Sequence, residues 1–328
     1  MGRQVRGGPR AVFRASQPAP SRPVLWCSAA PPALPEAFSR HATITRMSEA
    51  AAIQCSTGAF WTFELEEALD LIAEAGFKEI ELMVTRDPST QEPDLPLRLT
   101  TERGLKIGSI HAPFLVITKT VWGLDPVEKI RRGREMCAAL GCDSIIVHPP
   151  YLWERGYTRW LKNECRDFCS ETEIIVAVET MYPRWVAGRR VRAYKWLEVG
   201  ELAAAVPYVA LDTSHVTVAR QDILDAYSVA APKLHHIHLS DNAGDGRDGH
   251  LEFGQGILPI ERFLTELRQT EYEGVVSLEL SLRHYVEDRA SLISMLRRNR
   301  EYIEERLKRD PRVPKGMPRT EEVGTPWP

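Results

Sequence analysis

Nine side chains of types that bind divalent metals lie along this sequence, at the ends of short apolar runs or in the loops that follow them. They are His111, His148, Glu179, Asp212, His215, His238, Asp248, His250 and Glu279. Imidazole combined with carboxylate suits Zn²⁺, and also Mn²⁺, Fe²⁺ or Co²⁺. Charged groups that face a protein core must be paired or metal-bound, since burying them otherwise is costly. We therefore expect a site for divalent metal, with zinc first and Mn, Co or Mg as alternatives.

The apolar runs alternate with segments of helical periodicity, and this order predicts eight strand–helix units. The expected strands are 53–56, 78–83, 105–110, 144–147, 174–178, 209–211, 234–239 and 275–278. The expected helices are 63–75, 97–103, 125–140, 157–171, 196–205, 222–231, 259–269 and 287–307. Short, continuously apolar strands are typical of a parallel sheet that is covered on both faces.

This pattern predicts an α/β protein with a single (β/α)₈ TIM barrel domain over residues 47–308. A doubly wound open sheet is the alternative, but no Gly-rich nucleotide fingerprint follows the first strand. The C-terminal ends of barrel strands form one rim, where active sites lie. The barrel therefore predicts that the nine metal-binding side chains converge.

The two ends of the chain differ in composition from the periodic part. Residues 1–46 carry seven Arg, seven Pro and a single acid, Glu36, without helical or strand periodicity. We expect a disordered extension there; the alternatives are a targeting peptide and a start codon placed too early, with Met47 as the true start. Residues 309–328 contain five prolines and are expected to form a flexible tail.

Composition excludes several classes of protein. The net charge of −3 argues against a protein that coats nucleic acid by bulk charge, although a local basic groove stays compatible with it. No run approaches the roughly 20 apolar residues of a membrane span, so we expect no membrane partner. The six cysteines form no C-x-x-C pair and favour a reduced, cytoplasmic setting.

Several motifs together resemble the xylose isomerase-like TIM barrel superfamily over residues 52–305. They are His111-Ala-Pro, Val147-His148-Pro-Pro, Val178-Glu179-Thr, Leu211-Asp212-Thr-Ser-His215, His238-Leu-Ser-Asp241, Asp248-Gly-His250 and Gly254-Gln-Gly256. The segments 66–77 and 79–82 also resemble the first repeat of its sugar phosphate isomerase/epimerase members. As a set the motifs are specific for the superfamily and much less so for the reaction.

The resemblance implies one of two activities. In the isomerase and epimerase branch, a single divalent metal would be held by Glu179, Asp212, His238 and Glu279. The two glutamates would also move protons on either side of a carbonyl-bearing carbon. His215 and Arg247 would contact hydroxyls of a small sugar or sugar phosphate.

In the endonuclease IV branch, a family of AP endonucleases, all nine residues would hold three zinc ions and cleave a phosphodiester in DNA. The nine-residue set favours this branch. The mild acidity of the chain and the rim motifs, such as Thr213 and the 242–247 loop, favour the isomerase. We therefore expect an isomerase or epimerase, with the zinc phosphoesterase and a polyol dehydratase as alternatives.

Other residues receive supporting roles. The basic loop after the fifth strand, with Arg189 and Arg190, is a candidate clamp for a phosphate or nucleic acid, and otherwise a solvated loop or subunit contact. Trp153 is a candidate pocket wall. Asp241 would either orient a ligand histidine or cap its loop. Period-two alternation turns His236 inward with His238. Glu81 and His284 are further pocket candidates, and a homo-oligomer is compatible with the sequence.

Overall fold

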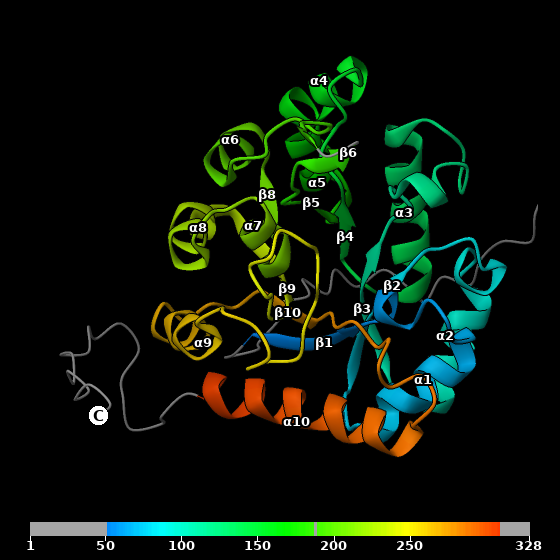
Figure 1. Cartoon of the computed structure of the whole chain (residues 1–328). Helices are drawn as coiled ribbons and strands as arrows, with labels where there is room; N and C mark the ends of the chain where they lie inside the picture. The colour runs from blue at the N-terminus through cyan, green and yellow to red at the C-terminus, as the bar shows by residue number, and fades with distance from the viewer. Residues whose placement is uncertain (1–50, 187–188, 309–328) are drawn as a thin grey trace, which may run out of the picture. The chain divides into compact units, whose positions relative to one another are not determined.

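Eight parallel strands close into a barrel in the computed structural model, which describes residues 51–186 and 189–308 (Figure 1). Their order around the ring is β1-β10-β9-β8-β5-β4-β3-β2. They are β1 Ala52–Ser56, β2 Glu79–Met83, β3 Lys106–His111, β4 Ser144–Val147, β5 Ile175–Glu179, β8 Tyr208–Asp212, β9 Leu234–Leu239 and β10 Val275–Leu278. The predicted (β/α)₈ barrel is therefore confirmed. The expectations for residues 1–46 and 309–328 lie outside the described residues.

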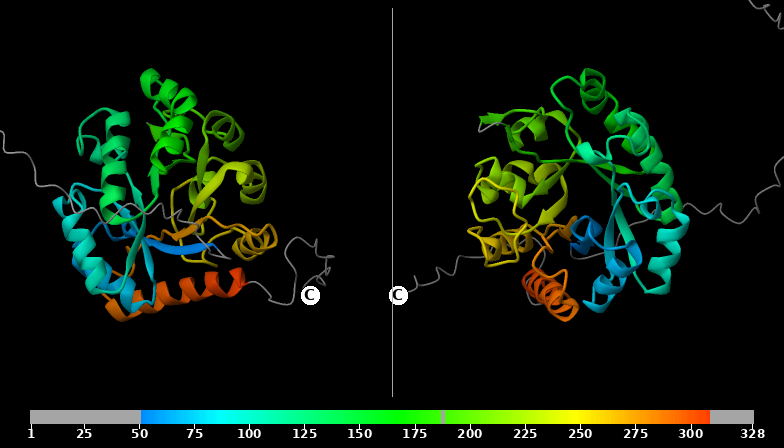
Figure 2. Two further views of the ribbon diagram at one scale, coloured as in Figure 1. Left: turned by 180° about the vertical axis from the view of Figure 1, so that it is seen from behind. Right: turned by 45° about the vertical axis from the view of Figure 1, so that its right-hand side comes forward.

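Helices cover the outside of this ring, and α10 lies beside both α9 and α1 where the ring closes (Figures 1 and 2). The α-helices are α1 Leu65–Glu74, α2 Asp94–Glu102, α3 Pro126–Leu140, α4 Arg155–Asn163, α5 Cys165–Thr172, α6 Val199–Ala205, α7 Thr213–Val218, α8 Ile223–Ala230, α9 Ile260–Gln269 and α10 Arg289–Leu307. Helix α3 begins where Asp125 accepts from two backbone amides and ends at Gly141, whose φ of 74° suits glycine. None of the helices in the described ranges is long and apolar enough to cross a lipid bilayer.

Three local features differ from the expectation. The helix predicted over 157–171 is divided at Glu164 into α4 and α5. The loop after β5 contains a two-stranded antiparallel hairpin, β6 Arg184–Val186 and β7 Arg189–Val191. The short helix α7 follows β8 directly, and the Asp212 carboxylate caps it by accepting from the backbone N–H of His215 at 2.8 Å.

The inside and the outside of the strand ring differ in chemistry. Apolar side chains such as Leu69, Ile72 and Ile80 fill the layer between strands and helices. Polar side chains are buried on the same strands, and two of them meet where Ser109 Oγ donates to Gln54 Oε1 at 2.6 Å. Side chains alternate between the two faces of a strand, so the helix-facing apolar layer and the polar interior come from the same segments.

Candidate metal centre

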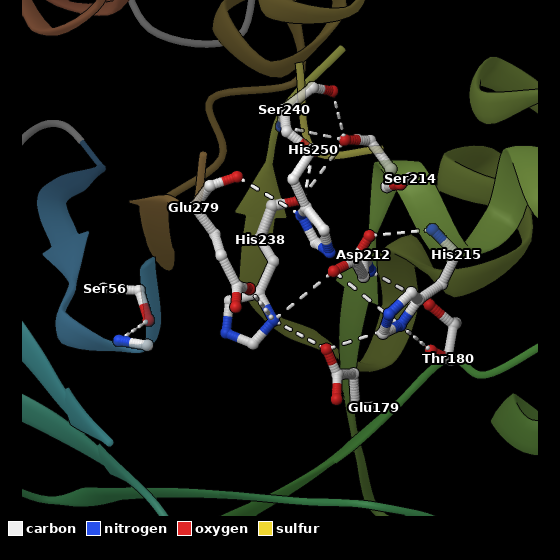
Figure 3. Close-up of polar contacts among 12 residues, drawn as sticks. Ser56, Glu179, Thr180, Asp212, Ser214, His215, His238, Ser240, His250 and Glu279 are labelled. Carbon is white, nitrogen blue, oxygen red and sulfur yellow. Dashed lines mark hydrogen bonds and ion pairs between the residues drawn. The ribbon is translucent and has the colours of Figure 1, made fainter. Parts of the chain in front are cut away.

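The nine predicted metal-binding residues lie together at one rim of the barrel. Figure 3 shows Glu179, Asp212, His215, His238, His250 and Glu279 among them. The donor atoms of eight of the nine residues form three overlapping groups, and within each group every donor lies within 4.8 Å of the others. Asp248 is the ninth residue, and its Oδ2 lies 3.2 Å from His215 Nε2. The groups are His111–His148–Glu179, Glu179–Asp212–His238–Glu279 and Asp212–His215–His250. Because Glu179 and Asp212 each belong to two groups, the three form one continuous cluster.

Glu179 lies at the middle of this cluster, at the end of β5, and four histidines surround it. Its Oε2 is 3.1 Å from His148 Nε2 and 3.5 Å from His111 Nε2. Its Oε1 is 2.7 Å from His238 Nδ1 and 3.6 Å from His215 Nδ1. The residue is almost completely buried. A single carboxylate thus faces imidazoles from four different elements.

The third group depends on helix α7 and on the loop after β9. The Nδ1 of His215 lies 2.8 Å from the carbonyl oxygen of Thr180, which can only accept, so Nδ1 carries the proton. Its Nε2 then faces Asp248 Oδ2 at 3.2 Å, and the other oxygen of Asp248 is 3.1 Å from His250 Nε2. The carboxylate of Asp248 therefore bridges two imidazoles.

The unsatisfied polar atoms of the cluster fit a bound cation. Glu179 Oε2, Asp212 Oδ2 and His148 Nδ1 are buried and have no hydrogen-bond partner among the described residues. Buried polar atoms normally have partners, and adjacent buried carboxylates repel one another. A divalent ion would give these atoms a partner and would offset the repulsion between the carboxylates. The mixed nitrogen and oxygen donors suit Zn²⁺, Mn²⁺ or Co²⁺.

Burial and neighbouring charges shift the pKa values of the carboxylates in opposite directions. Burial raises the pKa of both Asp212 and Glu279. Burial acts the same way on Glu179, but the charges of His238 and His215 outweigh it and bring its pKa well below the usual range. Such divergent environments are typical of functional sites.

A cavity of about 820 Å³ opens above the cluster. Glu279, Asp248 and His250 contribute to its wall, together with Arg247 and Trp61. This volume lies within the usual range of roughly 300–1,000 Å³ for small-molecule sites. The cluster is thus accessible from one side to a ligand of the size of a sugar.

The supporting residues lie in different places. Arg247 borders the cavity, whereas Arg189, Arg190 and Trp153 are not among the described residues that line it. Arg190 donates to the carbonyl oxygen of Val218, and Trp153, a residue that is 66% exposed, stacks on Tyr151.

Asp241 caps its loop, the second of the two roles considered for it. Its buried carboxylate accepts from the backbone N–H groups of Asn242, Gly254, Gly256 and Leu258 at 2.7–3.0 Å. The segment tied down in this way carries Asp248 and His250. The residue therefore positions the third group through the backbone.

Two side chains that sequence reasoning missed hold Asp248. Tyr182 Oη donates to Asp248 Oδ2 at 3.0 Å, and Ser214 Oγ donates to Oδ1 at 2.7 Å. Ser214 stands within the Asp212-Thr-Ser-His215 motif, which is a usable signal. The sequence offers no such signal for Tyr182, which lies three residues after Glu179. His236, on β9, faces inward, with Nε2 2.7 Å from Glu81 Oε2.

Comparisons with known proteins agree with the barrel fold. A family model described as xylose isomerase-like TIM barrel matches residues 69–305. An uncharacterized protein of Mycobacterium leprae (strain TN) is 28% identical over 269 residues, which are 76% of this chain and 96% of that protein. A probable endonuclease 4 of Mycobacterium tuberculosis (strain ATCC 25177 / H37Ra) is 27% identical over 164 residues, 45% of this chain and 63% of that protein.

Solved structures share the fold. A D-tagatose 3-epimerase-like protein superposes with a TM-score of 0.58 at 21% identity, over 78% of this chain and 100% of that one. The D-allulose 3-epimerase of Methylomonas sp., in complex with D-allulose, superposes with a TM-score of 0.57 at 17% identity, over 79% and 98%. At these identities the likeness is one of fold.

Proposed function

The chain belongs to the xylose isomerase-like TIM barrel family, and on that premise we propose that it is a divalent-metal-dependent isomerase or epimerase of a sugar or sugar phosphate. The observation that carries the proposal is the group of Glu179, Asp212, His238 and Glu279. It offers four donors to one ion and includes two glutamates, the residue type suited to moving a proton next to a carbonyl.

The two glutamates lie on different sides of the same imidazole. His238 Nδ1 is 2.7 Å from Glu179 Oε1 and 3.3 Å from Glu279 Oε2. Glu279 borders the cavity, so it is placed to exchange a proton with a bound sugar. His111 and His148 contact the other carboxylate oxygen of Glu179, Oε2, so Glu179 would keep its orientation. A bound divalent cation would supply polarisation of the substrate oxygens.

The wall of the cavity is polar and carries side chains of both charges. Arg247 and Arg283 border it on the loops after β9 and β10, and Trp61 adds an aromatic surface. The loops after the last two strands of a (β/α)₈ barrel frequently bind phosphate. Arginine matches the geometry of phosphate oxygens well. The wall therefore offers two cationic contacts for the phosphate of a sugar phosphate, beside the acidic Asp245 and Glu252.

A second candidate function rests on the complete set of nine donors. His111 and His148 on one side, and His215, Asp248 and His250 on the other, exceed what one metal ion needs. Such a set suits a cluster of zinc ions that cleaves a phosphodiester, as the likeness to endonuclease 4 also suggests. The candidate is a zinc phosphoesterase that acts on nucleic acid.

Two measurements on protein purified without chelators separate the candidates. The first is metal content by mass spectrometry, and the second is turnover of a panel of ketoses and ketose phosphates beside an oligonucleotide with an abasic site. About one ion per chain with ketose turnover supports the isomerase. About three zinc ions with oligonucleotide cleavage refutes it in favour of the phosphoesterase. Protein that binds no divalent metal refutes both.

A further inference from the structure

A buried glutamate that is not one of the nine predicted metal-binding residues contacts His238, which is. Glu81, on β2, is fully buried inside the strand ring. Its Oε2 is 2.9 Å from His238 Nε2 and 2.7 Å from His236 Nε2, and its Oε1 accepts from Ser56 Oγ at 2.8 Å. Side chains from β1 and β9 therefore converge on one carboxylate of β2.

The contact between Glu81 and His238 places a proton on Nε2 of His238. An ionised carboxylate only accepts, so His238 Nε2 must donate to Glu81. The other nitrogen, Nδ1, faces Glu179, Glu279 and Asp212 at 2.7, 3.3 and 3.8 Å. Without a bound ion Nδ1 also donates to Glu179 Oε1; a metal at Nδ1 would replace that proton and leave the one on Nε2 in place.

Two other histidines of the cluster also donate a ring N–H group to a fixed acceptor. That acceptor is a backbone carbonyl oxygen, which is weaker than a carboxylate. His111 Nδ1 lies 3.0 Å from the carbonyl oxygen of Ala112, and His215 Nδ1 lies 2.8 Å from that of Thr180. A carboxylate in this position fixes the ring and also makes the opposite nitrogen a stronger donor. His238, in the four-donor group, is held in this way by the carboxylate of Glu81.

We propose that Glu81 is a positioning residue that holds His238 with its proton on Nε2 and directs Nδ1 to the metal, with Ser56 and His236 holding Glu81 in turn. The inference rests on the proposed metal centre. The same three residues, Glu81, His236 and His238, could alternatively bind a separate ion. His238 Nε2 and Glu81 Oε2, 2.9 Å apart, form a direct hydrogen bond, and this bond carries the assignment. His236 Nε2 lies 2.7 Å from the same oxygen as an ion pair without hydrogen-bond geometry.

The first test reads the tautomer of His238 in the wild-type protein. Long-range ¹H–¹⁵N NMR of histidine-labelled protein, assigned with a His238→Gln variant, distinguishes a proton on Nε2 from one on Nδ1. In chelator-treated protein we expect a proton on Nε2 beside Glu81 and a second one on Nδ1 beside Glu179; after zinc is added we expect Nδ1 bound and the proton on Nε2 kept. An Nε2 without a proton in either state, or zinc on Nε2, would overturn the inference without any variant. Wild-type protein that keeps the Nε2–H form but binds no metal would refute the proposed function instead.

The second test measures zinc affinity by competition with a chromophoric chelator. Loss of an outer-shell carboxylate typically costs about 10–100-fold in metal affinity. We expect a loss of that size for Glu81→Leu and a smaller one for Glu81→Gln, whose amide oxygen can still accept from Nε2. Glu79→Gln, on the same strand but farther from the rim, is the control and should leave affinity unchanged. If Glu81→Leu and Glu79→Gln bind zinc equally well, the inference is wrong.

Discussion

Replacing Asp241 by asparagine tests how the third group of donors is held. Each oxygen of this carboxylate accepts two backbone N–H groups: Oδ1 those of Asn242 and Leu258, and Oδ2 those of Gly254 and Gly256. Asparagine keeps one oxygen and places an NH₂ group where the other stood. Two backbone amides then lose their acceptor and face a donor.

The expected cost follows from these contacts. A buried donor left without a partner costs about 1–3 kcal/mol. Because three of the four hydrogen bonds are only part-buried, water can satisfy part of what is lost, and we expect about 1–3 kcal/mol for the two amides together. This is a measurable part of the roughly 5–15 kcal/mol that stabilises a typical protein. The loss falls on the segment that carries Asp248 and His250, so part of it should appear as local opening of the loop.

Three measurements on Asp241→Asn would check this reasoning. Urea denaturation followed by circular dichroism gives the change in stability, hydrogen exchange gives the protection of the Gly254 and Gly256 amides, and mass spectrometry gives bound zinc. We expect lower stability, faster exchange and less bound metal. The control is Asp225→Asn at an exposed position of α8, which should stay within about 0.5 kcal/mol of the wild type. Unchanged exchange and stability in Asp241→Asn would refute the loop-cap assignment.

Three further perturbations probe the same centre. In Gly256→Ala the new Cβ would overlap the carbonyl oxygen of Asn242 and Asp241 Oδ1, so urea denaturation should show a loss of about 1–3 kcal/mol; an equally stable variant would contradict the tight approach. Glu279→Gln removes the carboxylate that borders the cavity and should lower turnover by at least about 100-fold in a steady-state assay, and wild-type rates would exclude its proton-transfer role. Chelation should lower the melting temperature seen by calorimetry, because it leaves Glu179 beside Asp212 without a cation; a melting curve that EDTA does not move would count against resident metal.

Much of the barrel is predictable because its strands are apolar runs between helical segments. The expected strands 144–147, 234–239 and 275–278 agree with the observed β4, β9 and β10. The hairpin β6–β7 escaped prediction because it is held by backbone pairing, and β7 exposes all of its side chains, so no apolar alternation marks it. Helix α7 escaped because a single turn capped by Asp212 is too short for a periodic pattern.

The convergence of the nine candidate residues was also predictable. Strand ends in a (β/α)₈ barrel meet at one rim, so residue type and position were enough to predict that these side chains lie together, while their binding of metal stays a prediction. Their partners depend on side-chain directions in the folded chain, which a sequence pattern does not contain. Tyr182 on Asp248, and Glu81 on both His236 and His238, are contacts of this kind.

The contrast between the two faces of the strand ring has a consequence for how this protein can change. The apolar layer outside the ring supplies most of the burial that stabilises the fold, while polar groups such as Gln54, Ser109 and Glu81 occupy its inside. Substitutions among the inner residues can therefore alter substrate preference or metal selectivity while leaving the helix-facing layer intact. Evolution could exchange one reaction for another on this scaffold without rebuilding what keeps it folded.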